Sequence, residues 1–133
     1  MRNHLFFKEG LLWEDSHWIF FLLKHITTVS FVSDVTYLHK RRPGSIVTGT
    51  NKRTEAKHRA IFFKDILMNL TNHDEWTEMS YIIEQFEPFY KQYVRELPEY
   101  KDVYRLFWKK AKECKHRKII MRLAICYIEG MMK

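Results

Sequence analysis

The stretch IFFKDILMNL, residues 61–70, decides the helical character of most of this chain. Its apolar side chains recur at the spacing that places them on one face of an amphipathic helix. No glycine occurs from residue 50 to residue 129, so no glycine loosens the backbone of this region. We therefore expect a helix over residues 54–71. The apolar positions of the stretch are Ile61, Phe62, Ile66, Leu67 and Leu70.

Further helices are expected beyond residue 71. Asn72 and Glu75 form the sequence pattern of a capping box, which opens a helix. Pro88 should kink or interrupt that helix, because proline removes a backbone hydrogen bond and clashes with the preceding turn. The spacing of the apolar residues then predicts helices over residues 100–114 and 118–131. The second part of the chain is therefore predicted to hold about four helices.

The first fifty residues have a different character. A helix is expected over residues 15–26, and the stretch TTVSFVSDVTYLHKRRPGS that follows is rich in β-branched and aromatic residues. It predicts two short strands, over residues 29–32 and 35–42, which Pro43 and Gly44 end. The fold class is therefore mostly α with a small β element. Because two strands and one helix are too little sheet to be stable alone, this region reads as the end of a larger α/β domain.

Composition limits the class of protein. With 133 residues, 46% of them hydrophobic, the chain can bury one core. We divide it into residues 1–53, the α/β part, and residues 54–133, a helical extension. Cys114 and Cys126 would lie about 18 Å apart on one straight helix, which excludes a disulfide and favours a reduced, cytoplasmic location. No apolar run approaches the ~18 residues of a membrane span, so we expect a soluble or peripherally bound protein.

The positive charge is concentrated near the C-terminus. Residues 101–122 carry nine Lys or Arg against Asp102 and Glu113, which accounts for the whole net charge of +7. The expected helix here is amphipathic, with Val103 and Phe107 on its apolar face. Its basic face suits either plain solvation, an anionic membrane surface or nucleic acid. Since the aromatic residues lie on or beside the apolar face, core packing is favoured over nucleic-acid stacking. The basic face is represented by Arg105, Lys109 and Lys112.

Two clusters could carry chemistry, and the first is FFKEGLLWEDSHW, residues 6–18. Glu14 and Asp15 stand at the start of the expected helix, and Gly10, after Glu9, permits a sharp bend before it. A carboxylate held on a rigid element can act as a general base when a substrate hydroxyl comes within hydrogen-bond reach. The alternative is that both acids only stabilise the helix start through capping and the helix dipole.

The second cluster is YLHKRRPGS, residues 37–45. Its imidazole and guanidinium groups stand beside a Pro-Gly-Ser turn, and together with loop N–H groups they could bind a phosphate. A basic edge strand that prevents aggregation would have the same composition. The candidate phosphate ligands are His39, Arg42 and Ser45.

Taken together and in this order, the two clusters resemble the closing half of the catalytic domain of family 2 glycosyltransferases, which have the GT-A nucleotide-sugar-binding fold. The resemblance rests on FFKEGLLWEDSHWIFFLL and VSFVSDVTYLHKRRPGSIVT and covers residues 1 to about 50. Bacterial members of the family build capsule, lipopolysaccharide and exopolysaccharide. The resemblance therefore implies a hexosyltransferase of cell-surface polysaccharide synthesis, at work in the cytoplasm or at the inner face of the cytoplasmic membrane.

The resemblance also implies roles for single residues. Asp15 matches the catalytic base that deprotonates the acceptor hydroxyl, and Glu14 matches its companion acid. Glu9 and Gly10 match the turn that borders the acceptor site. His39, Arg42 and Ser45 match the region that contacts the donor diphosphate or its metal. Where relatives often have arginine this chain has Lys40, which cannot form the same two-pronged contact.

Other parts of the family pattern are missing from this chain. No D-x-D motif, whose carboxylates would bind Mg²⁺ or Mn²⁺ in the family, occurs in the 133 residues. We expect an amino-terminal catalytic half to supply that metal and the nucleotide site, and the chain alone to be inactive. A nucleotide sugar and a glycan or glycolipid acceptor would be its substrates, and exposed apolar surface could lead to a homo-oligomer. The alternative is a stand-alone helical module that binds anionic membrane or nucleic acid through residues 101–122.

Overall fold

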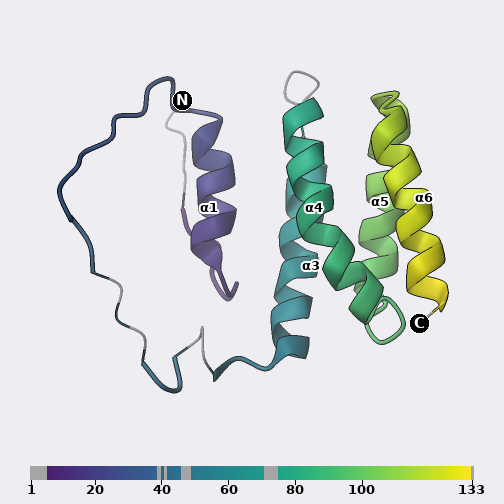
Figure 1. The fold of residues 1–133 in the computed structure, drawn as a ribbon, viewed down its shortest axis with the longest axis horizontal. Coiled ribbons are helices and arrows are strands. Elements are labelled where there is room, and N and C mark those ends of the chain that lie inside the picture. The colour runs from purple at the N-terminus through teal and green to yellow at the C-terminus, as the bar shows by residue number, and fades with distance from the viewer. Residues whose placement is uncertain (1–5, 39, 41, 46–48, 71–74, 133) are drawn as a thin grey trace. The chain divides into compact units, whose positions relative to one another are not determined.

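The computed structural model describes residues 6–38, 40, 42–45, 49–70 and 75–132. Two compact units share these residues, Met1–Glu55 and Ala56–Lys133. Within the described ranges the regular secondary structure is helical, which confirms the mostly helical fold class (Figure 1). The helices are α1 (Glu14–Leu23), α3 (Lys52–Met68), α4 (Glu75–Tyr93), α5 (Glu99–Glu113) and α6 (Arg117–Met132).

The prediction of a small β element over residues 29–42 is wrong: the described residues of this range form no strand. Residues 26–38 form an extended loop with a bend at Ser33 and Asp34, and residues 39 and 41 lie outside the described residues (Figure 1). Phe31 and Val35 are 94% and 89% exposed. The physical reason is that β-branched and aromatic residues favour strands only where a sheet face can be half-buried, and two short strands offer no such face.

Helix α3 begins and ends with local hydrogen bonds. The Asn51 side-chain oxygen accepts a hydrogen bond from the Arg53 N–H at 2.8 Å, which caps the helix start. At the other end Asn69 donates its side-chain amide to the Asp65 carbonyl at 2.8 Å. The helix predicted over residues 54–71 is therefore present, with ends shifted by these polar caps toward the N-terminus.

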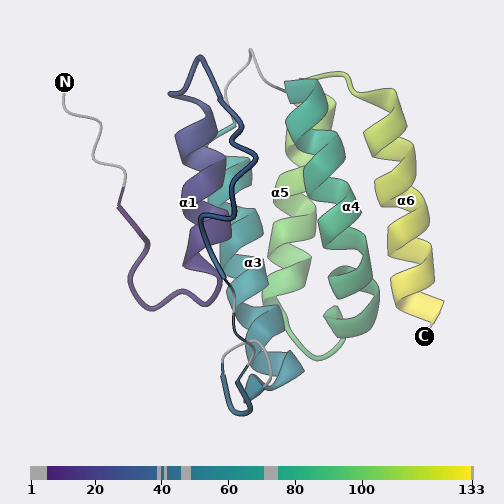
Figure 2. The same cartoon turned by 60° about the vertical axis from the view of Figure 1, so that its left-hand side comes forward.

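An aromatic core holds the second unit together. Phe86 of α4 is fully buried, and its ring centroid lies 5.3–6.0 Å from four other rings. These rings come from α3, α4 and α5, so the Phe86 side chain contacts residues of three helices. The backbones of these three helices are shown in Figure 2. We call this set the aromatic core, and its members are Phe63, Phe86, Tyr90, Tyr100 and Phe107. Aromatic pairs at such distances add to the stability that burial provides.

The aromatic core contains one polar group that is satisfied by a hydrogen bond, and the helix that carries Phe86 bends at a proline. The buried Tyr100 hydroxyl donates a hydrogen bond to the Ala56 carbonyl at 2.8 Å, which satisfies the phenol away from water. Helix α4 continues through Pro88 and changes direction along its length, as Figure 1 shows. The bend is the kink expected of a proline inside a helix.

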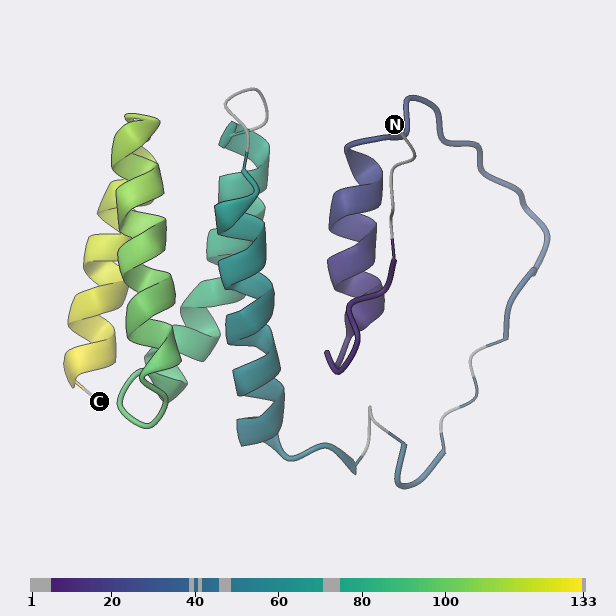
Figure 3. The same ribbon diagram turned by 180° about the vertical axis from the view of Figure 1, so that it is seen from behind.

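Helix α6 lies at one edge of this bundle (Figure 3). Arg122 pairs with Glu87 of α4 at 3.0 Å, and the Tyr104 hydroxyl of α5 donates to the Leu123 carbonyl at 3.2 Å. Gly130 allows the closest approach, since a Cβ there would lie 2.9 Å from the Tyr90 ring. The buried side of α6 consists of Ile119, Leu123, Cys126 and Gly130.

The contact between α5 and α6 should make the protein sensitive to alkali. Burial raises the pKa of the Cys126 thiol to about 12 and that of the Tyr104 phenol to about 12, from 9.0 and 10.0. The folded state thus favours the protonated thiol and the protonated phenol. Stability is unaffected below about pH 9, where both groups are protonated in the folded and the unfolded chain. As the pH rises toward 12, the unfolded chain loses these protons first, and the free energy of unfolding falls.

We therefore expect the free energy of unfolding to fall by about 1 kcal/mol per pH unit above pH 9. Urea titrations at several pH values between 8 and 11 would measure this slope. The variants Cys126→Ala and Tyr104→Phe each remove one titrating group, so each should flatten the slope. A slope that both variants leave unchanged would assign the alkaline sensitivity to other groups.

No helix among the described residues is both long enough and apolar enough to cross a membrane.

Candidate functional site

The start of α1 is shaped by two residues with left-handed backbone conformation. Gly10 has φ of 72°, and Trp13, which immediately precedes the helix, has φ of 63°. A side chain at Gly10 would meet nothing within 4 Å, so the backbone angle rather than crowding favours glycine there. The Leu11 N–H donates to the Lys8 carbonyl at 3.3 Å, which closes the turn that brings the chain into the helix.

Asp15 lies in the first turn of α1 with an exposed side chain. Its Oδ1 atom accepts hydrogen bonds from the Ser16 N–H at 2.7 Å and from the Ser16 hydroxyl at 3.5 Å. Glu14 beside it is half-buried, and Glu9 is exposed in the turn before the helix. Both helical acids lie where the helix dipole favours negative charge. No side-chain hydrogen bond caps the helix at Trp13, so the acids are placed for the dipole interaction and do not act as caps. The Asp15 carboxylate is exposed and therefore accessible to a ligand.

One aromatic contact links α1 to the residues before it, and another lies within the helix. The Trp18 ring lies 5.3 Å from the Phe7 ring, and the buried His17 ring lies 4.9 Å from the Phe21 ring of the same helix. Phe7 thus connects the segment before the turn to α1. These contacts explain why acids occur in so apolar a stretch: the rings pack along the helix while Asp15 remains at its exposed end.

The second cluster forms a turn. The Ser45 N–H donates to the Arg42 carbonyl at 3.2 Å, and Gly44 has φ of 75°. Proline followed by a glycine with positive φ is typical of a type II turn. Arg42 and Lys40 are exposed and Ser45 is half-buried, whereas His39 lies outside the described residues.

The structure thus shows the first cluster as a helix start and the second as a separate turn at the end of an extended loop. In the part of the chain that the structure describes, no three His, Cys, Asp or Glu side chains gather so that they could hold a metal ion.

The basic face of α5 is on the surface, and its apolar face is in the core. Arg105 pairs with Asp102 at 3.2 Å, and Lys109 with Glu113 at 3.8 Å. The Lys112 ammonium lies 5.3 Å from the Trp108 ring. The apolar residues of the helix are buried, so α5 cannot insert into lipid while the bundle is folded. The buried residues are Tyr100, Val103, Phe107 and Ala111.

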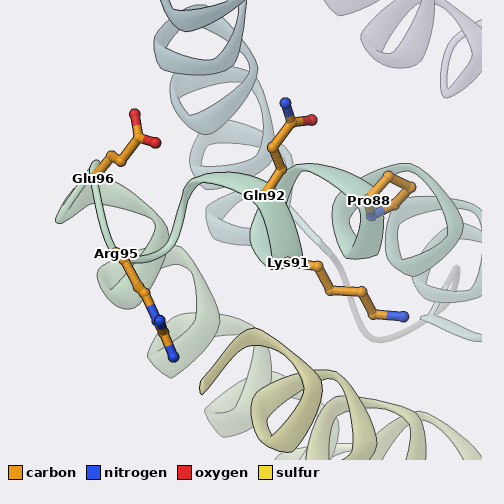
Figure 4. Close-up of a pocket in the computed structure, with 5 residues that line it drawn as sticks. All are labelled: Pro88, Lys91, Gln92, Arg95 and Glu96. Carbon is orange, nitrogen blue, oxygen red and sulfur yellow. The ribbon is translucent and has the colours of Figure 1, made fainter. Parts of the chain in front are cut away.

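A shallow depression at the C-terminal end of α4 was not anticipated from the sequence. Its lining consists of Pro88, Lys91, Gln92, Arg95 and Glu96. Lys91 pairs with Glu129 of α6, and the Arg95 guanidinium, which points toward α6 in Figure 4, donates to the Met131 carbonyl. Lys91 of α4 and Arg95 in the turn that follows it therefore both connect to α6. Sequence reasoning could not find these contacts, because Arg95 and Met131 are 36 residues apart.

Comparisons with known protein families, with curated proteins and with solved structures found no match to this chain. Its function must therefore be inferred from its residues and their placement. Two features are available for that purpose: an exposed carboxylate at the start of α1, and a cationic surface around α5 and the start of α6.

Proposed function

We propose that residues 1–53 form the acceptor side of the catalytic domain of an inverting family 2 glycosyltransferase. The observation that carries the proposal is the placement of Asp15, an exposed carboxylate in the first turn of a helix that follows a left-handed turn. The substrates would be a nucleotide sugar and a hydroxyl group of a glycan or glycolipid. In a bacterial cell such a reaction would build capsule, lipopolysaccharide or a related surface polysaccharide.

In the proposed reaction Asp15 takes the proton of the acceptor hydroxyl. The acceptor oxygen attacks the anomeric carbon, the bond to the diphosphate breaks, and the configuration at that carbon inverts. Glu14 and the turn at Glu9 and Gly10 would border the acceptor. Arg42 and Ser45, with His39, would offset charge on the diphosphate, together with Mg²⁺ or Mn²⁺ bound by an amino-terminal half.

The exposed apolar side chains of residues 26–38 support the proposal that another protein surface covers this loop. Phe31, Val32, Val35 and Leu38 are 94%, 70%, 89% and 72% exposed. Large contiguous exposed apolar segments usually contact another protein surface. In this proposal the partner is the nucleotide-binding half of the same catalytic domain, which would also supply the sheet that the predicted strands lack.

The test is a sugar-transfer assay on the intact enzyme, meaning this chain joined to its nucleotide-binding half. A panel of nucleotide sugars would be mixed with glycan and glycolipid acceptors, and the release of nucleoside diphosphate would be measured. We expect acceptor-dependent release by the intact enzyme, a product of inverted configuration by NMR, and no release by residues 1–133 alone. A product of retained configuration, or an intact protein that binds no nucleotide sugar, would contradict the proposal.

A second function, anion binding through residues 101–122, is favoured by the surface positions of Lys101, Lys112 and Lys115, which are all exposed. It would be independent of sugar transfer and could occur in the same protein. Such binding should weaken steeply as salt concentration rises, because screening reduces the attraction between surface charges and an anionic partner.

A further inference from the structure

Helix α6 has two apolar sides, and only one of them is buried in the bundle. Its inner side packs on α4 and α5, as described above. The opposite side carries Met121, Ile125, Ile128 and Met132, at intervals that place them one above another along the helix. They are 62%, 50%, 56% and 79% exposed. We call these residues the outer stripe. An apolar side of a helix is normally covered by another apolar surface.

Cations continue the outer stripe at its N-terminal end. Arg117 precedes Met121 by four residues and Ile128 by eleven, so it lies on the same side of α6. Lys118 lies beside it, and both are exposed. The first turn of α6 contains no acid, although a helix N-terminus favours negative charge. An anionic partner at this end would therefore offset both the two cations and the helix dipole.

A second copy of this chain fits the outer stripe poorly. Stable protein interfaces use roughly 20–30 residues and about 800 Å² on each side, which is more than a stripe of this width offers. The region around it carries most of the positive charge of the protein, so two copies would repel each other. Glu129, the acid that α6 could offer to a partner's Arg117, already pairs with Lys91.

An anionic lipid surface fits both the apolar and the charged features. Helices that lie in the plane of a membrane bury an apolar side at the boundary of headgroups and acyl chains, with Lys and Arg close to the phosphates. Met131, which is 49% exposed, lies beside the outer stripe and widens the apolar side of α6.

We propose that the outer stripe of α6, with Arg117 and Lys118, docks the protein on the surface of an anionic lipid bilayer. The helix lies along the surface with its inner side still packed on α4 and α5. The inference goes beyond sugar transfer and does not rest on it. It also moves the membrane contact from α5, whose apolar face is in the core, to α6.

The experiment is co-sedimentation of the full chain with vesicles. Vesicles of phosphatidylcholine mixed with phosphatidylglycerol would be compared with vesicles of phosphatidylcholine alone, at low and high salt. We expect binding to the anionic vesicles and at least about tenfold weaker binding to the neutral ones, since each Lys or Arg near an anionic surface contributes to affinity. High salt should weaken the binding by screening.

Two double variants separate the apolar contribution to vesicle binding from the electrostatic one. Ile125→Ser with Ile128→Ser removes the centre of the outer stripe, and Arg117→Gln with Lys118→Gln removes its cations. Each should weaken binding to the anionic vesicles by about tenfold or more. Matched controls on α3 are Ile61→Ser with Met68→Ser and the single variant Lys64→Gln, which alter side chains that are also exposed. They should bind within about twofold of the original chain.

Thermal unfolding shows whether the variants retain the fold, which is expected because every changed side chain is exposed. Binding that survives the loss of Ile125 and Ile128 would show a purely electrostatic contact and overturn the proposal. So would concentration-dependent dimerisation, lost in the same variant, without vesicle binding. Binding to a single-stranded oligonucleotide in place of vesicles would likewise overturn it and assign the cations to nucleic acid.

Discussion

If the proposed sugar transfer is correct, replacing Asp15 with asparagine should lower kcat of the intact protein by about 10²–10⁴-fold, the usual contribution of a general base. Asparagine has nearly the same shape as aspartate but cannot accept the proton of the acceptor hydroxyl. It keeps a side-chain oxygen that can accept the hydrogen bond from the Ser16 N–H. The start of α1 should therefore persist, and donor affinity, measured by calorimetric titration with the nucleotide sugar, should change by less than about twofold.

The matched control for this variant is Asp34→Asn. Asp34 is an exposed carboxylate in the extended loop, and the proposed reaction gives it no role. Its replacement should leave kcat within about twofold of the original enzyme. Turnover by Asp15→Asn at the level of Asp34→Asn would remove Asp15 from the role of base and leave it as a helix-start residue. Loss of donor binding in Asp15→Asn would instead indicate a wider structural effect.

Replacing Phe86 with alanine should reduce the free energy of unfolding by about 3–5 kcal/mol. Phe86 is fully buried, and its ring lies within 6.0 Å of the rings of Phe63, Tyr90, Tyr100 and Phe107, measured between centroids. Alanine would remove these contacts and leave a cavity between α3, α4 and α5. The loss is large beside the total stability of about 5–15 kcal/mol that is normal for a domain.

Urea titration of the full chain, followed by far-UV circular dichroism, would measure the loss. Tyr81→Ala is the matched control because Tyr81 is an aromatic residue of the same helix but is 53% exposed. It should cost less than about 1 kcal/mol. If Phe86→Ala cost no more than Tyr81→Ala, the aromatic core would not be the main source of stability in the second unit.

The two predictions concern different units of the chain. Asp15 belongs to Met1–Glu55 and Phe86 to Ala56–Lys133. In Met1–Glu55 much of the loop of residues 26–38 is exposed, whereas Ala56–Lys133 has a buried aromatic core. A catalytic defect in Asp15→Asn without a change in stability, and a stability defect in Phe86→Ala, would therefore be the expected pair of results.

Features that depend on residues close together in the chain could be predicted. The helix expected over residues 100–114 is α5, Glu99–Glu113, because its apolar spacing is a local pattern. The helix expected over residues 15–26 is α1, Glu14–Leu23, whose start was predicted within one residue from the adjacent acids and whose end was predicted three residues too late. The strands predicted over residues 29–32 and 35–42 are not seen in the described residues of those ranges, because a strand needs a partner from elsewhere and the composition of a segment does not supply one.

The helices, the acids at the start of α1 and the concentration of charge in residues 101–122 can all be inferred from the amino-acid sequence. Three features could be found only in the folded chain: Arg95 reaches the Met131 carbonyl, the apolar face of α5 is in the core, and Met121 and Ile128 remain exposed. The difference arises because helical periodicity comes from hydrogen bonds between residues four apart in the chain. Burial depends on which distant helices pack against each face, and spacing along the chain does not specify them.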